Sequence, residues 1–229
     1  LMNEFFENHN GKNFEVYAFS FQASLENDSY RQKIKKNVKF FYDVEDKSDN
    51  EIVSISRKLN LDIAVDLNGH TQNARTIIFS KRVAPIQINF LGFPGTMGAN
   101  FYDYIIADKF VIPEESKVFY NEKVLYMPNS YLINPSVRKV SNNKITKKSE
   151  GLPEDCFVFC CFNNSYKITS EEFDIWMKLL NKVEKSVLWL RKSNHVSEAN
   201  LKNEAIKRKI DPSRLVFAEM ILIKDHLAR

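Results

Sequence analysis

The feature that most constrains the fold of this chain is an apolar run that ends abruptly in polar residues. Residues 156–162 (CFVFCCF) are all apolar, and such a run is typical of a strand in a parallel sheet that is covered on both faces. Residues 163–167 (NNSYK) follow directly. A helix is predicted to begin near Thr169 or Ser170, because Glu172, three residues after the threonine, matches a capping box.

The polar run is predicted to lie at the ligand-binding edge of that sheet, since ligands bind just beyond the carboxyl ends of parallel strands. Asn163 and Asn164 offer amides, Lys167 offers an ammonium group, and a helix N-terminus lies just behind them. This combination suits an anion, most often a phosphate. A loop that is polar only because it faces water explains the same residues, so both interpretations stay open here.

Strand-like and helix-like segments alternate along the chain, which is the rhythm of an open parallel α/β sheet. The predicted strands cover residues 14–21, 38–44, 62–67, 86–91, 104–107, 124–127, 156–162, 187–190 and 215–217. The predicted helices cover residues 30–36, 49–59, 73–81, 114–120, 170–183 and 198–210, and another opens at about residue 224. We therefore expect an α/β fold.

A change of composition divides the chain. Residues 136–150 are polar and rich in lysine, with almost no apolar periodicity. We expect an N-terminal lobe over residues 1–135, a linker over 136–155, and the start of a second lobe over 156–229. Two α/β domains joined by a linker imply a cleft between two strand-end surfaces.

Composition excludes several functional classes. The net charge is only +4, with acidic and basic residues interspersed, so no basic stripe predicts nucleic-acid binding. No apolar stretch reaches the roughly 18–20 residues that cross a membrane, and the cysteines and histidines lack the spacing of a zinc site. The three cysteines share one predicted strand, where neighbours point to opposite faces. A reduced, cytoplasmic protein is expected.

The N-terminal lobe offers two further polar strand ends. His70 follows the strand over 62–67 and could hydrogen-bond a sugar or a diphosphate, although a structural role fits it too. The strand over 86–91 ends in the glycine-rich run 92–98, in which Phe93-Pro94-Gly95-Thr96 lie where backbone can approach a ligand. This run is neither a P-loop nor a dinucleotide fingerprint, and a plain tight turn explains it as well.

His226 and Arg229 are three residues apart on a predicted helix and would share a face. They could address a nucleotide, or they could be a solvated helix face. Together, strand-end clusters from two domains could line one cleft, a geometry common to two-domain enzymes that bind nucleotide sugars.

Seven motifs in order carry a family resemblance. They are DLNGHT (66–71), APIQ (84–87), LGFPGT (91–96), DYIIAD (103–108), EK (122–123), YMP (126–128) and FNNSYKI (162–168). Over nearly its whole length the chain resembles the catalytic region of the O-GlcNAc transferases, the family-41 glycosyltransferases, with the SPINDLY O-fucosyltransferases as close relatives. The resemblance implies a GT-B architecture, in which two Rossmann-like parallel-sheet domains face a cleft.

The resemblance also implies an activity: inverting transfer of N-acetylglucosamine from UDP-GlcNAc to Ser or Thr of proteins, with no metal or other cofactor required. The expected partners are the nucleotide-sugar donor and a protein acceptor, with no nucleic acid and no membrane. The matching residues imply catalytic roles for Lys167, which would stabilise the leaving diphosphate, and for His70. They imply donor or nucleotide contacts for Asn163, Asn164, Phe93, Pro94, Gly95, Thr96, His226 and Arg229. The general base is unassigned.

The sequence lacks several segments of the family pattern, and it leaves alternatives to this activity open. In the family, a strand with a His-containing turn precedes the segment that begins here, and a His-Thr-Thr segment and often a tetratricopeptide array lie outside it. We therefore expect a fragment truncated at both ends, which alone binds donor poorly and is inactive or nearly so. A protein O-fucosyltransferase using GDP-fucose, a non-catalytic protein-binding remnant and a nucleotide-sugar epimerase are the competing interpretations.

Overall fold

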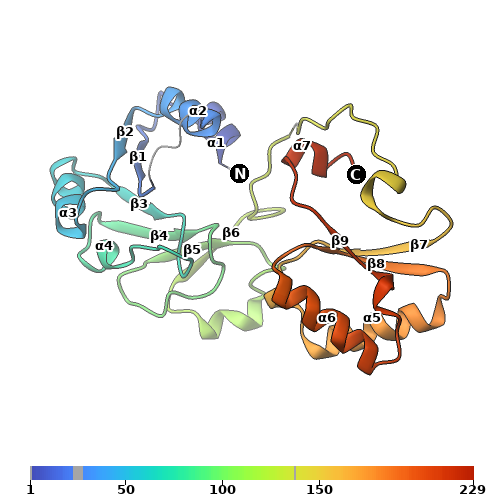
Figure 1. The fold of residues 1–229 in the computed structure, drawn as a ribbon. Helices are drawn as coiled ribbons and strands as arrows, with labels where there is room; N and C mark the ends of the chain where they lie inside the picture. Colours follow the sequence, from blue (N-terminus) through green and yellow to red (C-terminus); the bar gives the residue numbers. More distant parts are fainter. Residues whose placement is uncertain (1, 23–27, 137) are drawn as a thin grey trace. The chain divides into compact units, whose positions relative to one another are not determined.

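The computed structural model describes residues 2–22, 28–136 and 138–229 of the chain. The chain divides into two compact units, Leu1–Ser136 and Val137–Arg229. Each unit contains a parallel sheet with helices packed on it, so the α/β fold class is confirmed (Figure 1). No helix among the described residues is both long enough and apolar enough to cross a membrane.

The first unit is built on a four-stranded parallel sheet of order β3-β4-β5-β6, with a separate parallel pair β1-β2. Its elements are α1 (Asn3–Asn8), β1 (Tyr17–Ser20), α2 (Ser29–Asn37), β2 (Phe40–Asp43), α3 (Asp49–Lys58), β3 (Ile63–Asp66), α4 (Ile77–Ser80), β4 (Ile86–Phe90), β5 (Tyr104–Ala107), the 3₁₀ helix η1 (Glu114–Phe119) and β6 (Lys123–Tyr126).

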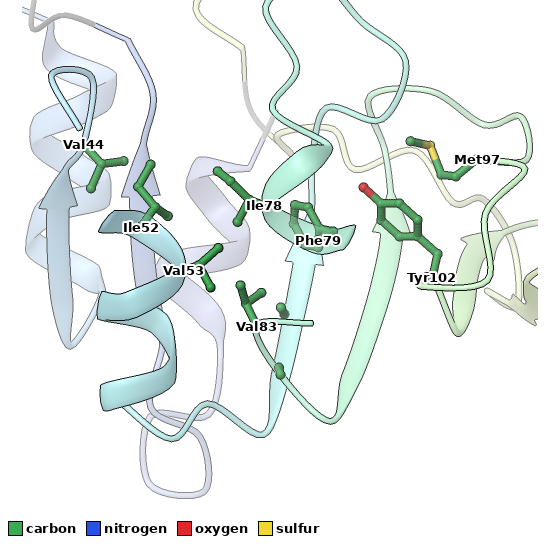
Figure 2. Close-up of a cluster of buried hydrophobic side chains, with 10 residues drawn as sticks. Val44, Ile52, Val53, Ile78, Phe79, Val83, Met97 and Tyr102 are labelled. Atoms are coloured by element: carbon green, nitrogen blue, oxygen red, sulfur yellow. The ribbon is translucent and has the colours of Figure 1, made fainter. Parts of the chain in front are cut away.

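The main core of the first unit lies between α3, α4 and the sheet. Figure 2 shows Ile52 and Val53 of α3 pointing toward Ile78 and Phe79 of α4. Burial of each such side chain stabilises the fold by about 1.5–3 kcal/mol. Helix α3 begins at Asp49, as predicted. Ser48 caps it in a reciprocal capping box with Glu51. This core fixes the sheet whose strand ends carry the candidate site.

The second unit is built on a three-stranded parallel sheet of order β7-β8-β9. Its elements are the 3₁₀ helix η2 (Lys148–Glu150), β7 (Phe157–Cys161), the 3₁₀ helix η3 (Ser165–Lys167), α5 (Ser170–Lys182), β8 (Ser186–Arg191), α6 (His195–Lys207), the 3₁₀ helix η4 (Pro212–Arg214), β9 (Leu215–Ala218) and α7 (Ile223–His226).

Alternate residues of β8 serve two separate cores. Leu188 and Leu190 pack with residues of α5 and α6, which lie on one face of the sheet (Figure 1). Val187 and Trp189 pack on the other face with Leu152. Leu152 comes from the segment expected to be a linker, so residues 138–155 lie with the second unit and help to cover its sheet.

Strand β7, within the apolar run 156–162, is less buried than its composition predicts. Strand β7 is an edge of the described sheet, and Phe157 is 58% exposed. The neighbouring β8 lies between two strands and is buried from Ser186 to Leu190. Residues of β7 do pack on both faces of the sheet, Phe159 with the Leu188 cluster and Val158 with the Trp189 cluster, but they are only partly buried. An apolar run alone does not reveal whether a strand is central or at an edge.

The predicted helix over residues 73–81 is shorter in the structure, where α4 covers only Ile77–Ser80. Asn73 has a φ of 63°, a left-handed conformation that a helix does not continue through. Arg75, just before α4, donates to Asp49 Oδ1 over 2.7 Å and to the Lys47 carbonyl over 2.7 Å. Its guanidinium therefore ties the loop before α4 to the start of α3.

Candidate functional site

The carboxyl end of β3 is shaped by a buried carboxylate. Asp66 is 5% exposed, and its Oδ1 accepts hydrogen bonds from the backbone N–H groups of Asn68 (2.9 Å) and Gly69 (3.2 Å). Its Oδ2 accepts from the hydroxyl of Tyr102 over 2.5 Å. Burial and the adjacent Asp66 raise the pKa of the Tyr102 phenol, so the hydroxyl stays protonated and donates. Asp66 thus bends the chain sharply and presents His70 just beyond the strand.

The structure brings His70 and Phe93 together, although they follow different strands. Their rings meet edge-on, with centroids 5.4 Å apart and planes at 69°. Strands β3 and β4 are parallel, with Asp66 opposite Asn89, so the turns that follow them leave the sheet side by side. His70 is exposed, and its imidazole is available to a ligand at this strand-end edge.

The two turns pack backbone against backbone. A Cβ atom on Gly92 would lie 2.3 Å from the carbonyl oxygen of Leu67 and 2.5 Å from that of Asn68. Gly69 has a φ of +56°, which is the left-handed region that favours glycine. Close approach and backbone conformation therefore explain these two glycines.

Buried side chains hold the predicted sugar-contacting turn from below. Asn89 is fully buried, and its Nδ2 donates to the carbonyl oxygens of Phe93 (3.1 Å) and Gly95 (3.3 Å). The hydroxyl of Tyr120 donates to the Pro94 carbonyl over 3.1 Å. Sequence reasoning missed both residues; the one available signal was an amide within a mostly apolar strand.

Thr96, a predicted donor contact, has a hydroxyl that is already engaged. It donates to Oε2 of Glu122 over 2.7 Å and accepts from the N–H of Gly98 over 3.0 Å. Glu122 is only 3% exposed, and its Oε1 accepts from the Met97 N–H over 2.6 Å. The Thr96 side chain therefore closes the turn, and a ligand would meet the turn through Phe93 and backbone atoms.

In the second unit, the polar run folds as the short helix η3 between β7 and α5. Lys167 is exposed and ends η3, three residues before the first residue of α5. Its N–H donates to the Asn164 carbonyl over 3.0 Å. Helix α5 begins with the predicted capping box between Thr169 and Glu172. Lys167 thus lies between the end of a strand and the N-terminus of a helix, a kind of position where anions are stabilised.

Arg191, which the sequence did not single out, connects the strand ends of this unit. It ends β8, and its guanidinium donates to the Asn164 side chain after β7 and to the Met220 sulfur after β9. Asn163 is exposed beside Asn164. Of the predicted loop residues, Asn164 therefore belongs to a strand-end cluster with Arg191 and Met220. The missed signal was a basic residue at the end of a buried strand.

Arg229 is buried rather than free. Its side chain is 4% exposed, with the guanidinium 5.0 Å from the Phe162 ring centroid and 5.4 Å from that of Trp189. It donates to Oε2 of Glu150 over 3.2 Å and to the Glu219 carbonyl over 3.1 Å. This arrangement supports the sheet face, and a direct contact with a nucleotide stays a prediction.

His226 contacts Arg229, although the two residues do not share a helix face as predicted. Helix α7 covers only Ile223–His226, so Arg229 follows the helix instead of sharing its face. The Nε of Arg229 nevertheless donates to His226 Nδ1 over 3.2 Å, and the imidazole meets Phe162 edge-on at 5.2 Å. Within the described residues, no three His, Cys, Asp or Glu side chains gather as metal ligands would.

Comparison with known proteins agrees with the expected family. The sequence model described as glycosyl transferase family 41 matches residues 1–142 and 136–229. A probable UDP-N-acetylglucosamine–peptide N-acetylglucosaminyltransferase SEC of Arabidopsis thaliana is 34% identical over 234 residues, covering 100% of this chain and 24% of the relative. A UDP-N-acetylglucosamine–peptide N-acetylglucosaminyltransferase of Caenorhabditis elegans is 23% identical over 335 residues, covering 96% of this chain and 29% of the relative.

The fold of this chain is also similar to that of a solved O-GlcNAc transferase structure. A mutant of the O-GlcNAc transferase of Thermobaculum terrenum superposes with a TM-score of 0.85 at 26% identity, over 99% of this chain and 42% of that one. The chain thus spans about a quarter of the length of the two curated relatives that it matches. With both halves of the sequence matched, the chain belongs to glycosyl transferase family 41.

Proposed function

We propose that the protein transfers N-acetylglucosamine from UDP-GlcNAc to Ser or Thr hydroxyl groups of protein acceptors, with inversion and without a required metal. Membership of glycosyl transferase family 41 supports this proposal. The names of the relatives support the same donor, because the plant and nematode proteins are described as UDP-N-acetylglucosamine–peptide N-acetylglucosaminyltransferases. A reducing compartment, the cytoplasm, is part of the proposal and fits three free cysteines.

The position of Lys167 carries the mechanistic part of the proposal. Departure of UDP builds negative charge on the diphosphate, and a cation held beside a helix N-terminus lowers that barrier. Lys167 is exposed at the end of η3 and is followed by the capped start of α5. In the proposed reaction its ammonium group binds the diphosphate and stabilises it as it leaves. A charge stabiliser of this kind is typically worth about 10²–10³-fold in kcat.

The other residues divide between sugar and nucleotide. His70 and Phe93, in edge-on contact, are proposed to line the sugar site together with the backbone of Pro94 and Gly95. On the other unit, Asn163, Asn164 and His226 are proposed to contact the nucleotide. Arg229, held by Glu150, is proposed to support this surface from behind.

A transfer assay tests the proposal. The complete gene product is incubated with radiolabelled UDP-GlcNAc or GDP-fucose and a mixture of acceptor proteins, and label in protein is counted. The proposal predicts incorporation from UDP-GlcNAc, released by β-elimination as expected for an O-linked sugar. Incorporation from GDP-fucose alone would identify an O-fucosyltransferase. Conversion of the free UDP-sugar without label in protein would identify an epimerase and contradict the proposal.

A further inference from the structure

Two amide side chains of β4, Gln87 and Asn89, are fully buried and point to the same face, because they are two residues apart. Gln87 lies toward the amino end of the strand. Its Nε2 donates to the carbonyl oxygens of Phe79 (2.9 Å) and Phe101 (2.5 Å), and its Oε1 accepts from the Val83 N–H over 2.9 Å. The side-chain hydrogen bonds of Gln87 therefore tie together segments of the fold and do not reach the turn after β4.

The carboxamide of Asn89 makes its hydrogen bonds at the opposite, carboxyl end of the strand. Both of its Nδ2 hydrogen bonds go to the turn after β4, to the carbonyl oxygens of Phe93 and Gly95. Its Oδ1 is buried and has no hydrogen-bond partner among the described residues. An unpaired buried oxygen costs stability. The Asn89 carboxamide, with hydrogen bonds on its nitrogen but none on its oxygen, is therefore not explained by stability alone. Its hydrogen bonds fix the turn after β4.

Contacts around Phe93 show what the turn positions. A Cβ atom on Gly95 would lie 2.4 Å from Cε1 of the Phe93 ring, so the ring lies directly over that glycine. A Cβ atom on Gly69 would lie 3.0 Å from Cβ of Phe93 and 3.1 Å from Oδ1 of Asn89. The Phe93 ring then meets His70 edge-on. A shift of the Phe93 or Gly95 carbonyl would therefore move the ring that contacts His70.

We propose that Asn89 is a positioning residue for the sugar-binding edge of the first unit, because its carboxamide holds the Phe93–Gly95 turn in the conformation that places Phe93 against His70. Asn89 is buried and does not itself touch a substrate. The inference rests on the proposed function for its catalytic consequence, while the positioning of the His70–Phe93 pair is independent of it.

Matched substitutions at Asn89 and Gln87 test this inference in the complete gene product. Asn89→Asp and Asn89→Ser are compared with Gln87→Glu and Gln87→Ser, and kcat/KM for UDP-GlcNAc is expressed per folded molecule, as measured by circular dichroism. Both pairs remove buried amide donors, so both should lower the unfolding midpoint. Only the Asn89 variants should lower kcat/KM, by about 10- to 100-fold, the loss expected from misplacing a binding group.

The pH profile of Asn89→Asp separates positioning from stability. The introduced carboxylate, when ionised, would face two carbonyl oxygens and repel them, whereas its protonated form can donate one hydrogen bond; burial raises the pKa of such a carboxyl. The folded variant should therefore recover part of its kcat/KM as pH falls, relative to wild type. Asp66, opposite in register, His70 and Glu122 are present near this turn in both proteins, so the wild-type profile is the reference. Asn89→Ser should show no such recovery.

A donor-independent measurement keeps this test separate from that of the proposed function. The His70 ring protons should carry a ring-current shift from Phe93 in NMR spectra, lost in the Asn89 variants and kept in the Gln87 variants. If the protein transfers no sugar but the shift behaves as expected, the positioning role stands and the proposed function fails. Equal effects of Asn89 and Gln87 variants on kcat/KM and on the shift would overturn the inference, as would unfolding of every Asn89 variant.

Discussion

The guanidinium of Arg229 and the carboxylate of Glu150 form a sheltered ion pair that joins the end of the chain to the segment before β7. The two groups approach to 3.2 Å, with side chains 4% and 18% exposed. Arg229 also covers Phe162 and Trp189, so the pair closes one face of the β7-β8-β9 sheet. Residues that resembled a linker in the sequence thus contribute to the core of the second unit.

Removal of the carboxylate should destabilise this unit. Glu150→Ala leaves the Arg229 guanidinium sheltered from water with one fewer partner, and hydrogen bonds to charged groups contribute about 1.5–3 kcal/mol. We expect a decrease of that size in the free energy of unfolding, measured by urea titration. Glu154→Ala, which removes an exposed carboxylate from the same segment, should change it by less than about 0.5 kcal/mol. Equal effects would show that the ion pair contributes no specific stability.

Gly92 should tolerate no side chain. In Gly92→Ala the new Cβ would overlap the carbonyl oxygens of Leu67 and Asn68, so the turns after β3 and β4 must separate. Overpacking of this kind typically costs about 1–3 kcal/mol, occasionally more. Gly11→Ala is the control, since its Cβ would meet only His9 Nε2 at an ordinary 3.7 Å. A thermal melt in which the two variants match would mean that the two turns do not pack as described.

The cap of α5 should contribute less to stability in acid. The Thr169 hydroxyl, and then the Thr169 N–H, lower the pKa of Glu172 by hydrogen bonding to its carboxylate. A folded-state pKa below the unfolded value gives stability that is present above the unfolded value, about 4.3, and is lost as pH falls through the folded one. Glu172→Gln should therefore be less stable than wild type at pH 7 and lose that deficit in acid.

Urea midpoints at several pH values measure this difference. Glu184→Gln, an exposed change beyond the end of α5, is the matched control and should show no pH-dependent difference from wild type. A Glu172→Gln deficit that stays constant from neutral pH into acid would contradict the assigned cap.

Local signals in the sequence were sufficient for much of the fold. The strand predicted over residues 104–107 is β5 with the same bounds, and the predicted capping box does begin α5. These features depend on neighbours within a few positions, which a sequence displays directly. The seven ordered motifs were likewise sufficient for the family, which the comparison confirms.

Features that depend on distant residues were not predictable in this way. Asn89 and Arg191 are visible in the sequence as polar residues in or at the end of apolar strands, but the turn and the strand ends that they contact are not. Nothing local marks β7 as an edge strand. The left-handed conformation of Asn73, which keeps the predicted helix from beginning at that residue, is a property of the folded loop. The buried state of Arg229 depends on Glu150, which is far from it in sequence.

The central claim is that the Lys167 ammonium group stabilises the leaving diphosphate, and one comparison tests it most directly. Lys167→Met and Lys178→Met, the latter an exposed lysine on α5, are introduced separately into the complete gene product, and transfer from UDP-GlcNAc to protein is measured. We predict that Lys167→Met lowers kcat by about 10²–10³-fold with its circular dichroism spectrum unchanged, and that Lys178→Met keeps wild-type activity. A Lys167→Met variant that transfers sugar at the wild-type rate would contradict the claim.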